Sequence, residues 1–205
     1  MSTQKEETRT RLFDAARKLL VKRGFHQVAL EDIAAEAGVS RQAVYKSHFA
    51  SKAELLLALV RHLHEAENLD ELTKPYYAAT SGLEMLREAI RTIVLIEVRI
   101  HDVAIALAAA GTSDEGAAAA LHDRLEVKRG AIRAALERVK NDGHLSPDWQ
   151  LEQALDLLAS LLSVDTYEQL VIQGSWSPDQ LIARIQQLSA VFVTQPAARK
   201  PRRSA

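Results

Sequence analysis

The stretch from residue 30 to residue 49 constrains the fold of this chain more than any other part of the sequence. A short helix with one apolar face is predicted over residues 30–37, and Gly38 ends it. Ser40 then stands where its hydroxyl can accept a hydrogen bond from a free backbone amide of a second helix, expected over residues 41–48. Two helices joined by a short turn that contains glycine form the layout of a helix-turn-helix.

The rest of the chain also predicts helices, because apolar residues recur at helical spacings and no alternating strand pattern of useful length is present. We therefore expect an all-α protein of about nine helices. The helices expected outside the helix-turn-helix cover residues 8–23, 51–72, 83–110 (one long or two abutting helices), 117–141, 147–173 and 178–194. The predicted organisation is a helix-turn-helix domain over residues 1–52, a larger helical domain over 53–194 that begins with a connecting helix at 53–72, and a disordered basic tail over 195–205.

Composition excludes several kinds of protein and of site. The 205 residues include no cysteine, which excludes disulfides, thiolate metal sites and cysteine nucleophiles. No stretch reaches the roughly 18 uncharged apolar residues of a membrane span, and the charged N-terminus lacks the apolar core of a signal peptide. The seven histidines show no metal-ligand spacing. We expect a soluble, cytoplasmic protein with no metal, no other cofactor and no membrane partner.

Charge is distributed unevenly along the chain, although the total is −1. Residues 1–63 carry 11 basic and 7 acidic side chains, residues 64–194 carry 11 and 20, and the tail adds four basic side chains. A basic N-terminal segment followed by an acidic body favours a polyanion as the partner of that segment. An imbalance as small as this also arises by chance.

Further short motifs precede, overlap and follow the predicted helix-turn-helix along the chain. They follow a basic first helix and comprise Gly24-Phe25, Asp32-Ile33-Ala34, Ala37-Gly38-Val39-Ser40, Tyr45, His48-Phe49, Ser51-Lys52 and Leu55. With these motifs, residues 8–60 resemble the tetracycline-repressor (TetR) family, whereas the remainder resembles it only in the number and order of helices. The resemblance implies a bacterial transcription regulator that binds an operator in double-stranded DNA.

The outward face of the predicted second helix suits the reading of base edges. Val44 is expected to face inward with Ala43, which leaves Arg41 and Gln42 outward. Arginine can bond two acceptors of guanine, and glutamine can do the same for adenine. The resemblance implies that the residues matching Arg41 and Gln42 read bases. The alternative for Arg41 is a solvated surface charge.

Five further side chains are expected to contact the DNA, mainly at its backbone: Ser40, Tyr45, Lys46, His48 and Lys52. Hydroxyl groups suit phosphate contacts, which position a protein without reading sequence. Lys52 begins the following helix, so its charge and the free amides of that helix end can together bind a phosphate. The resemblance implies that the residues matching Tyr45, His48 and Lys52 hold the backbone. A core position for Tyr45 and a helix-capping role for His48 are the alternatives.

The chain departs from the family pattern at two places. Val28 and Ala29 stand where the family usually has a hydroxyl residue that caps the helix and touches phosphate, and a missing cap costs about 1 kcal/mol of helix stability. Three residues instead of two separate Tyr45 from Phe49, and one extra residue rotates all later positions of a helix by about 100°. Either a longer helix or a bulge is expected there, which weakens the assignment of His48.

The last two expected helices are candidates for a dimer interface. The penultimate helix is apolar on two sides and therefore needs two partners, such as its own core and a second subunit. The resemblance implies that both helices pair with their copies in a four-helix bundle, and the two-fold symmetry of such a homodimer predicts a palindromic operator. The residues expected in this interface are Leu157, Leu161, Val164, Leu181, Ile185 and Leu188.

A small-molecule site is expected where polar groups interrupt apolar stripes. Glu97 interrupts a stripe that runs from Leu86 to Leu107, with His101 one turn further on, and Asp165 interrupts a stripe on the penultimate helix. We expect Glu97, His101 and Asp165 to line a pocket for an unidentified apolar or amphipathic effector. A buried pair of Glu97 with an arginine and exposure of this face to solvent are the alternatives.

Together these features favour a dimeric repressor that a small ligand releases from its operator. The second hypothesis is a DNA-binding regulator without a ligand, which acts as an activator or under the control of a partner protein. The third is an enzyme on a helical scaffold, but the chain has no Gly-rich phosphate loop, no His-x-x-x-His pair and no nucleophile elbow. A non-enzymatic role is therefore expected.

Overall fold

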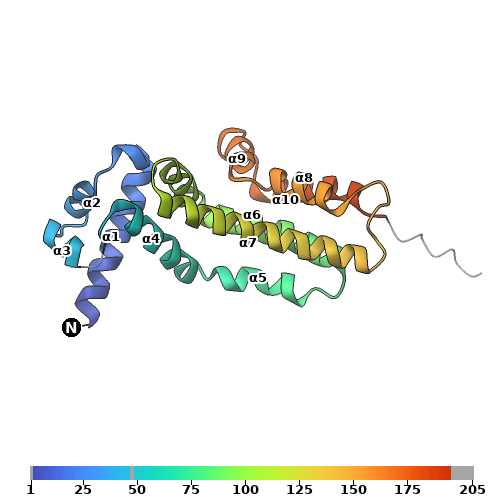
Figure 1. Ribbon diagram of the computed structural model, residues 1–205, viewed down its shortest axis with the longest axis horizontal. Helices are drawn as coiled ribbons and strands as arrows, with labels where there is room; N and C mark the ends of the chain where they lie inside the picture. The colour runs from blue at the N-terminus through green and yellow to red at the C-terminus, as the bar shows by residue number, and fades with distance from the viewer. Residues whose placement is uncertain (1, 47–48, 195–205) are drawn as a thin grey trace, which may run out of the picture. The chain divides into compact units, whose positions relative to one another are not determined.

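The computed structural model describes residues 2–46 and 49–194, with side chains from residue 5 onward except those of Tyr45 and Lys46. Over this part of the chain there are ten α-helices, labelled in Figure 1, and no strand; a single antiparallel bridge joins Leu145 to Val193. The expected all-α fold is confirmed. No helix among the described residues combines the length and the apolar character needed to cross a membrane.

The chain divides into two compact units. Unit 1 contains residues 1–72 and 95–127, and unit 2 contains residues 73–94 and 128–205. The long helices α6 (Gly82–Gly111) and α7 (Glu115–Asn141) contribute to both units. The domain boundary predicted after residue 52 stays a prediction, although the helix that comes after it shares the core of unit 1.

Unit 1 is built around the first four helices. They are α1 (Ser2–Arg23), α2 (Leu30–Glu36), α3 (Arg41–Lys46) and α4 (Lys52–Ala66), with a 3-10 turn at Phe25–Gln27. Their apolar faces meet in one core, which includes Leu12, Leu19, Ile33, Val44, Phe49, Leu55 and Leu59. Helix α1 begins six residues earlier than predicted, because the Gln, Lys and Glu residues before Thr8 are themselves good helix formers.

The prediction of a single helix from Ser51 to residue 72 is wrong. Helix α4 ends at Ala66, and α5 (Leu69–Ala78) follows after a turn in which Asn68 adopts a φ of 47°. Asparagine tolerates this left-handed conformation better than most residues. Pro75 lies inside α5 at an exposed position, where water can replace the one backbone hydrogen bond that proline removes.

Unit 2 contains an interrupted helix where one continuous helix was expected over residues 147–173. Helix α8 (Leu151–Leu161) ends before Ser163, whose hydroxyl accepts a hydrogen bond from the Thr166 amide at 3.1 Å and starts α9 (Val164–Tyr167). The chain continues as a π-helix over Glu168–Gln173. The predicted start of the last helix is confirmed: Ser177 caps α10 (Pro178–Ser189), which ends in a 3-10 turn at Ala190–Phe192.

Within unit 2 the beginning of α6 lies against the end of α7 (Figure 1). The Gly82 amide donates a hydrogen bond of 2.6 Å to Asp142 Oδ2. A Cβ atom on Gly82 would come within 2.3 Å of the Val139 backbone nitrogen. Only glycine permits the two helices to approach this closely.

Candidate functional site

The turn between α2 and α3 is fixed by local geometry. Gly38 has a φ of 63°, a conformation that glycine adopts without strain, and the Val39 amide bonds to the Ala34 carbonyl at 3.0 Å. The Ser40 hydroxyl accepts a hydrogen bond from the Ala43 amide at 3.2 Å, which confirms the predicted cap. Val44 is buried, so the inner face of α3 is anchored in the core of unit 1 as expected.

The predicted base-reading residues lie on the solvent side of α3. Arg41 and Gln42 are exposed, and the Arg41 guanidinium forms an ion pair of 2.9 Å with Glu31 of α2. Glu31 thus supplies the Arg41 guanidinium with an acceptor within the chain. Base contacts by Arg41 and Gln42 stay predictions.

The remaining part of the recognition segment falls partly outside the described residues. Helix α3 extends through Lys46, but the side chains of Tyr45 and Lys46 and all of Ser47 and His48 are outside the description. The predicted contacts of Tyr45, Lys46 and His48, and the way in which the extra residue before Phe49 is accommodated, therefore stay predictions.

Helix α2 begins without a hydroxyl cap, as the sequence indicates. Ala29 occupies the N-cap position, and the Asp32 carboxylate reaches back to accept a hydrogen bond from its amide at 2.9 Å. Asp32 therefore satisfies one of the free amides at this helix end in place of a hydroxyl side chain.

Lys52 braces the loop that leads into α2. Its ammonium donates hydrogen bonds to the carbonyls of Phe25 and, at 2.6 Å, of Val28, and it lies 3.9 Å from the centre of the Phe25 ring. Burial lowers the pKa of Lys52, and the nearby charge of Asp32 opposes part of this effect. The ammonium thus has partners within its own chain, and the predicted phosphate contact of Lys52 stays a prediction.

An ion-pair network within unit 1 connects α1 to α6. Arg17 Nε lies 2.7 Å from Asp102 Oδ2, and Arg17 Nη2 donates to Asp102 Oδ1 at 3.3 Å and to the Arg99 carbonyl at 2.9 Å. Glu67, at the end of α4, lies 3.7 Å from Arg17 and 3.8 Å from Arg99. The hydrogen bond with Asp102 raises the pKa of Arg17 against the opposing effect of burial. Helix α1, which precedes the helix-turn-helix and shares its core, is thereby tied to α6.

The same part of α6 lines a pocket within unit 1 with a volume of about 170 Å³. Helices α4, α5, α6 and α7 contribute its walls, and none of its ten lining residues is acidic. The apolar wall consists of Val60, Leu63, Leu69, Ile100, Val103, Ala104 and Leu107. Three basic residues, Arg61, His64 and Arg124, complete the lining.

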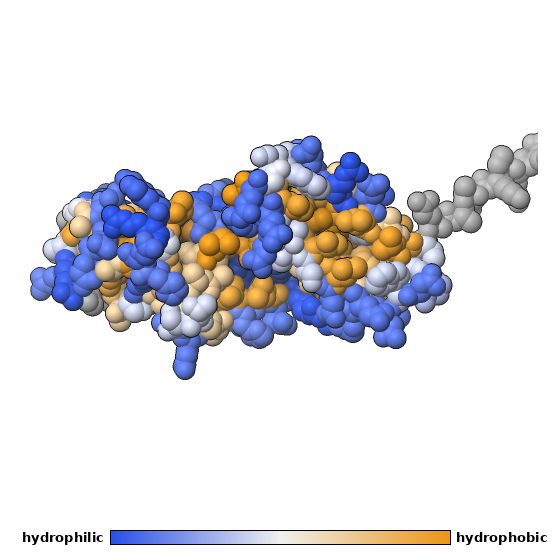
Figure 2. Space-filling model, turned by 90° about the horizontal axis from the view of Figure 1, so that it is seen from above, coloured by the Kyte–Doolittle hydropathy of each residue, from blue (hydrophilic) through white to orange (hydrophobic). Residues whose placement is uncertain are grey.

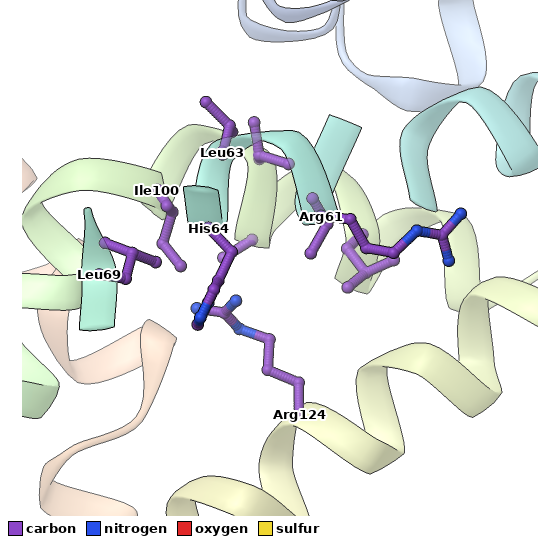
Figure 3. Close-up of a pocket in the computed structure, with 10 residues that line it drawn as sticks. Arg61, Leu63, His64, Leu69, Ile100 and Arg124 are labelled. Carbon is purple, nitrogen blue, oxygen red and sulfur yellow. The ribbon is translucent and has the colours of Figure 1, made fainter. Parts of the chain in front are cut away.

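Sequence reasoning missed Arg124. In Figure 3 its side chain extends from α7 into the pocket toward His64, whereas the Arg61 guanidinium is turned away from it. Burial lowers the pKa of Arg124, and the charge of Glu97 opposes part of this effect. A signal for it exists in the sequence, because Arg124 interrupts the apolar spacing of Ala117 and Leu121 along α7.

The predicted pocket residues occupy different environments. Glu97 is buried in its stripe and bonds to His101 at 3.1 Å, one turn further along α6; neither residue lines the pocket described above. Among the described residues the Glu97 carboxylate is bonded to His101, and it acts on Arg124 through its charge, so the alternative of a Glu97–arginine pair stays open. Asp165 is exposed in α9 and belongs to unit 2. A role for these three residues in ligand binding stays a prediction.

The predicted interface residues of α8 to α10 divide into two groups. Leu181 and Ile185 are buried inside unit 2, whereas Leu157 is 42% and Leu188 is 52% exposed, and Leu161 and Val164 are half-buried. Figure 2 shows apolar side chains gathered on the face over α8 and α10. Val191, just beyond α10, is also exposed.

Comparison with known proteins gives one family for the N-terminal part. The model described as "Bacterial regulatory proteins, tetR family" matches residues 12–59. The transcriptional regulator TtgR of Pseudomonas putida is 46% identical over 63 residues, which are 31% of this chain and 30% of that protein. The chain matches 30% to 41% of the length of the first four curated relatives, so it spans less than half of each of them.

Solved structures resemble the whole chain. A regulatory protein in the tetR family from Rhodococcus RHA1 has a TM-score of 0.75 at 20% identity, over 91% of this chain and 96% of that one. A transcriptional regulator from Saccharomonospora viridis, solved in complex with choline, has a TM-score of 0.75 at 19% identity, over 93% of this chain and 100% of that one. At these identities the likeness establishes the fold.

Proposed function

We infer that the chain is a TetR-family, sequence-specific DNA-binding regulator of transcription, because the model of that family matches residues 12–59. The observation that carries the inference is the anchored α3: its inner face is buried, Ser40 caps its start, and Arg41 and Gln42 lie exposed on its outer face. A helix presented in this way fits the major groove, where arginine and glutamine can each make paired hydrogen bonds to base edges.

In the proposed complex, the segment from Ser40 to His48 supplies two kinds of contact. Arg41 and Gln42 read bases, whereas Ser40, Tyr45, Lys46 and His48 position the domain on phosphates. Phosphate contacts contribute affinity that falls with salt, and base contacts contribute discrimination between sequences. The Arg41–Glu31 pair breaks when the guanidinium meets a base, so part of the gain in binding is offset by its loss.

The active form is proposed to be a homodimer. The exposed apolar side chains of Leu157, Leu188 and Val191 supply a surface that a second copy can cover, together with the half-buried Leu161 and Val164. Leu181 and Ile185 are buried within unit 2 and therefore supply no exposed part of this surface. Two-fold symmetry then places two copies of α3 on a palindromic operator.

The regulator is proposed to be a repressor that a small molecule releases from DNA. The pocket of unit 1 is lined by Ile100, Val103 and Leu107 of α6, and the same stretch of α6 carries Asp102, the partner of Arg17 in α1. A ligand that favours a different position of α6 therefore also changes what holds α1. Ligand-bound dimers would favour a spacing of the two reading heads that misses successive major grooves.

The test is the affinity of the full-length chain for a palindrome bordering its own coding region, compared with random DNA at physiological salt. We expect clear preference for the palindrome, and Gln42→Ala should lower that preference by about 10- to 100-fold at one position of each half-site. Arg87→Ala, an exposed arginine in unit 2, is the matched control and should leave it unchanged. Equal affinity for both DNAs would refute the proposal; specific binding that no small molecule weakens would favour a ligand-independent regulator.

A further inference from the structure

We propose that the pocket of unit 1 selects a small anionic amphipathic molecule, whose oxyanion headgroup, a carboxylate in the simplest case, binds Arg124 while its apolar body fills the pocket. The inference deepens the proposed function, because it names the chemical class of the effector. It rests on three observations: a cation without a partner among the described residues, an apolar wall of limited volume, and a lining that includes no acidic residue.

The Arg124 side chain presents hydrogen-bond donors to the pocket. Among the residues that the structure describes, its guanidinium forms no hydrogen bond and no ion pair; Glu97 acts on it only through its charge. A partly buried guanidinium in such a position has given up water without gaining a fixed acceptor. An oxyanion supplies what it lacks, since the planar guanidinium matches a carboxylate with two parallel hydrogen bonds.

The neighbouring charges favour an anion and disfavour a cation. Arg124 points toward His64 in Figure 3. His64 Nε2 is hydrogen-bonded to Asp70 Oδ1 at 2.9 Å, and the Asp70 side chain is 86% exposed. Glu97 is the acidic group that acts on Arg124, and its carboxylate is already bonded to His101. The headgroup end of the pocket therefore carries basic groups, and the two acidic side chains nearby, Asp70 and Glu97, are already bonded to His64 and His101.

The volume and the wall define the rest of the molecule. A dry apolar cavity of about 150 Å³ is sufficient for benzene, and the pocket measures about 170 Å³. Its apolar wall leaves no polar partner for a second headgroup at the opposite end. The expected ligand is thus a single oxyanion on one aromatic ring or a short aliphatic chain.

The experiment measures direct binding to the full-length chain, without DNA, at constant ionic strength. Benzoate is compared with the uncharged benzamide and the cationic benzylamine by titration calorimetry and by the rise in melting temperature. We expect benzoate to bind most tightly of the three. Arg124→Gln should lower the affinity for benzoate by about 10- to 100-fold and leave the affinity for benzamide unchanged. Arg11→Gln, an exposed arginine of unit 1 that does not line the pocket, is the matched control and should change benzoate binding by less than about two-fold.

Two results would overturn the proposal: equal affinity for benzoate and benzamide, or unchanged benzoate binding by Arg124→Gln. Because the headgroup comparison uses the unaltered chain, it decides the matter even if Arg124→Gln does not fold. This binding experiment and the test of the proposed function can fail independently of each other. Selective benzoate binding supports this ligand class whether or not DNA is released, whereas failure to prefer the operator refutes the regulator proposal alone.

Discussion

Replacing Lys52 by methionine separates a structural role from a DNA contact. The change keeps the apolar stem and removes two hydrogen bonds from the ammonium, to Phe25 and Val28, together with its contact with the Phe25 ring. A hydrogen bond involving a charged group is worth about 1.5 to 3 kcal/mol and a cation–π contact about 0.5 to 1 kcal/mol. The side chain is partly exposed and its burial is itself unfavourable, so the net loss should be about 2 kcal/mol.

A loss of that size lowers the melting temperature of a chain of this length by about 4 to 8 °C, which circular dichroism can follow. Lys18→Met is the control: Lys18 pairs with Glu36 on the exposed surface of the same unit and should cost less than about 1 kcal/mol. The salt dependence of operator binding gives a second measurement. If Lys52 instead contacts phosphate, the slope of log affinity against log salt falls by about 1 and stability hardly changes, and this result would refute the structural role.

Three further predictions concern other parts of the molecule. Gly82→Ala should lower the free energy of unfolding by about 2 kcal/mol in urea titrations, because the added methyl group meets the Val139 backbone. Asp142→Asn should make stability less sensitive to acid: the Gly82 amide lowers the pKa of Asp142 from 3.8, so its contribution is complete above that value and is lost as pH falls through the lowered pKa. Melting temperatures measured from neutral pH down to about pH 3 would show a smaller fall for Asp142→Asn. An equal fall in the variant and the unaltered chain would contradict the prediction. Arg17→Met should cost about 1 kcal/mol, and a double-mutant cycle with Asp102→Asn should show that most of this cost is shared; additive losses would exclude the network.

Local signals were sufficient for the helix-turn-helix. Gly38 and Ser40 act within their own turn, through a positive φ and a hydroxyl cap, so their effect can be inferred from the residues themselves. The start of α10 at Ser177 and Pro178 obeys the same logic. In each case the interaction spans no more than four residues, which is the range over which a sequence pattern predicts structure reliably.

The interruptions and the pocket depend on contacts that no local pattern contains. Apolar spacing continues through Asn68 and through Ser163, yet the chain turns at both because packing of the flanking helices in their units outweighs one continuous helix. The partners of Lys52 lie 24 and 27 residues away in sequence. Arg124 is visible as an interruption of a stripe, but its position in a pocket emerges only once α4, α6 and α7 are assembled.

The π-helix after α9 also bears on how this chain compares with its relatives. A π-turn holds one more residue than an α-turn, so this segment accommodates a single inserted residue without ending the helix. Deleting one residue between 168 and 173 should return this turn to α geometry and leave the residues beyond it, including Trp176, on the same face. Correct alignment of α10 with a relative whose helix is regular here would then need a one-residue gap before Gly174, and residues matched across that point without the gap would be assigned to the wrong face.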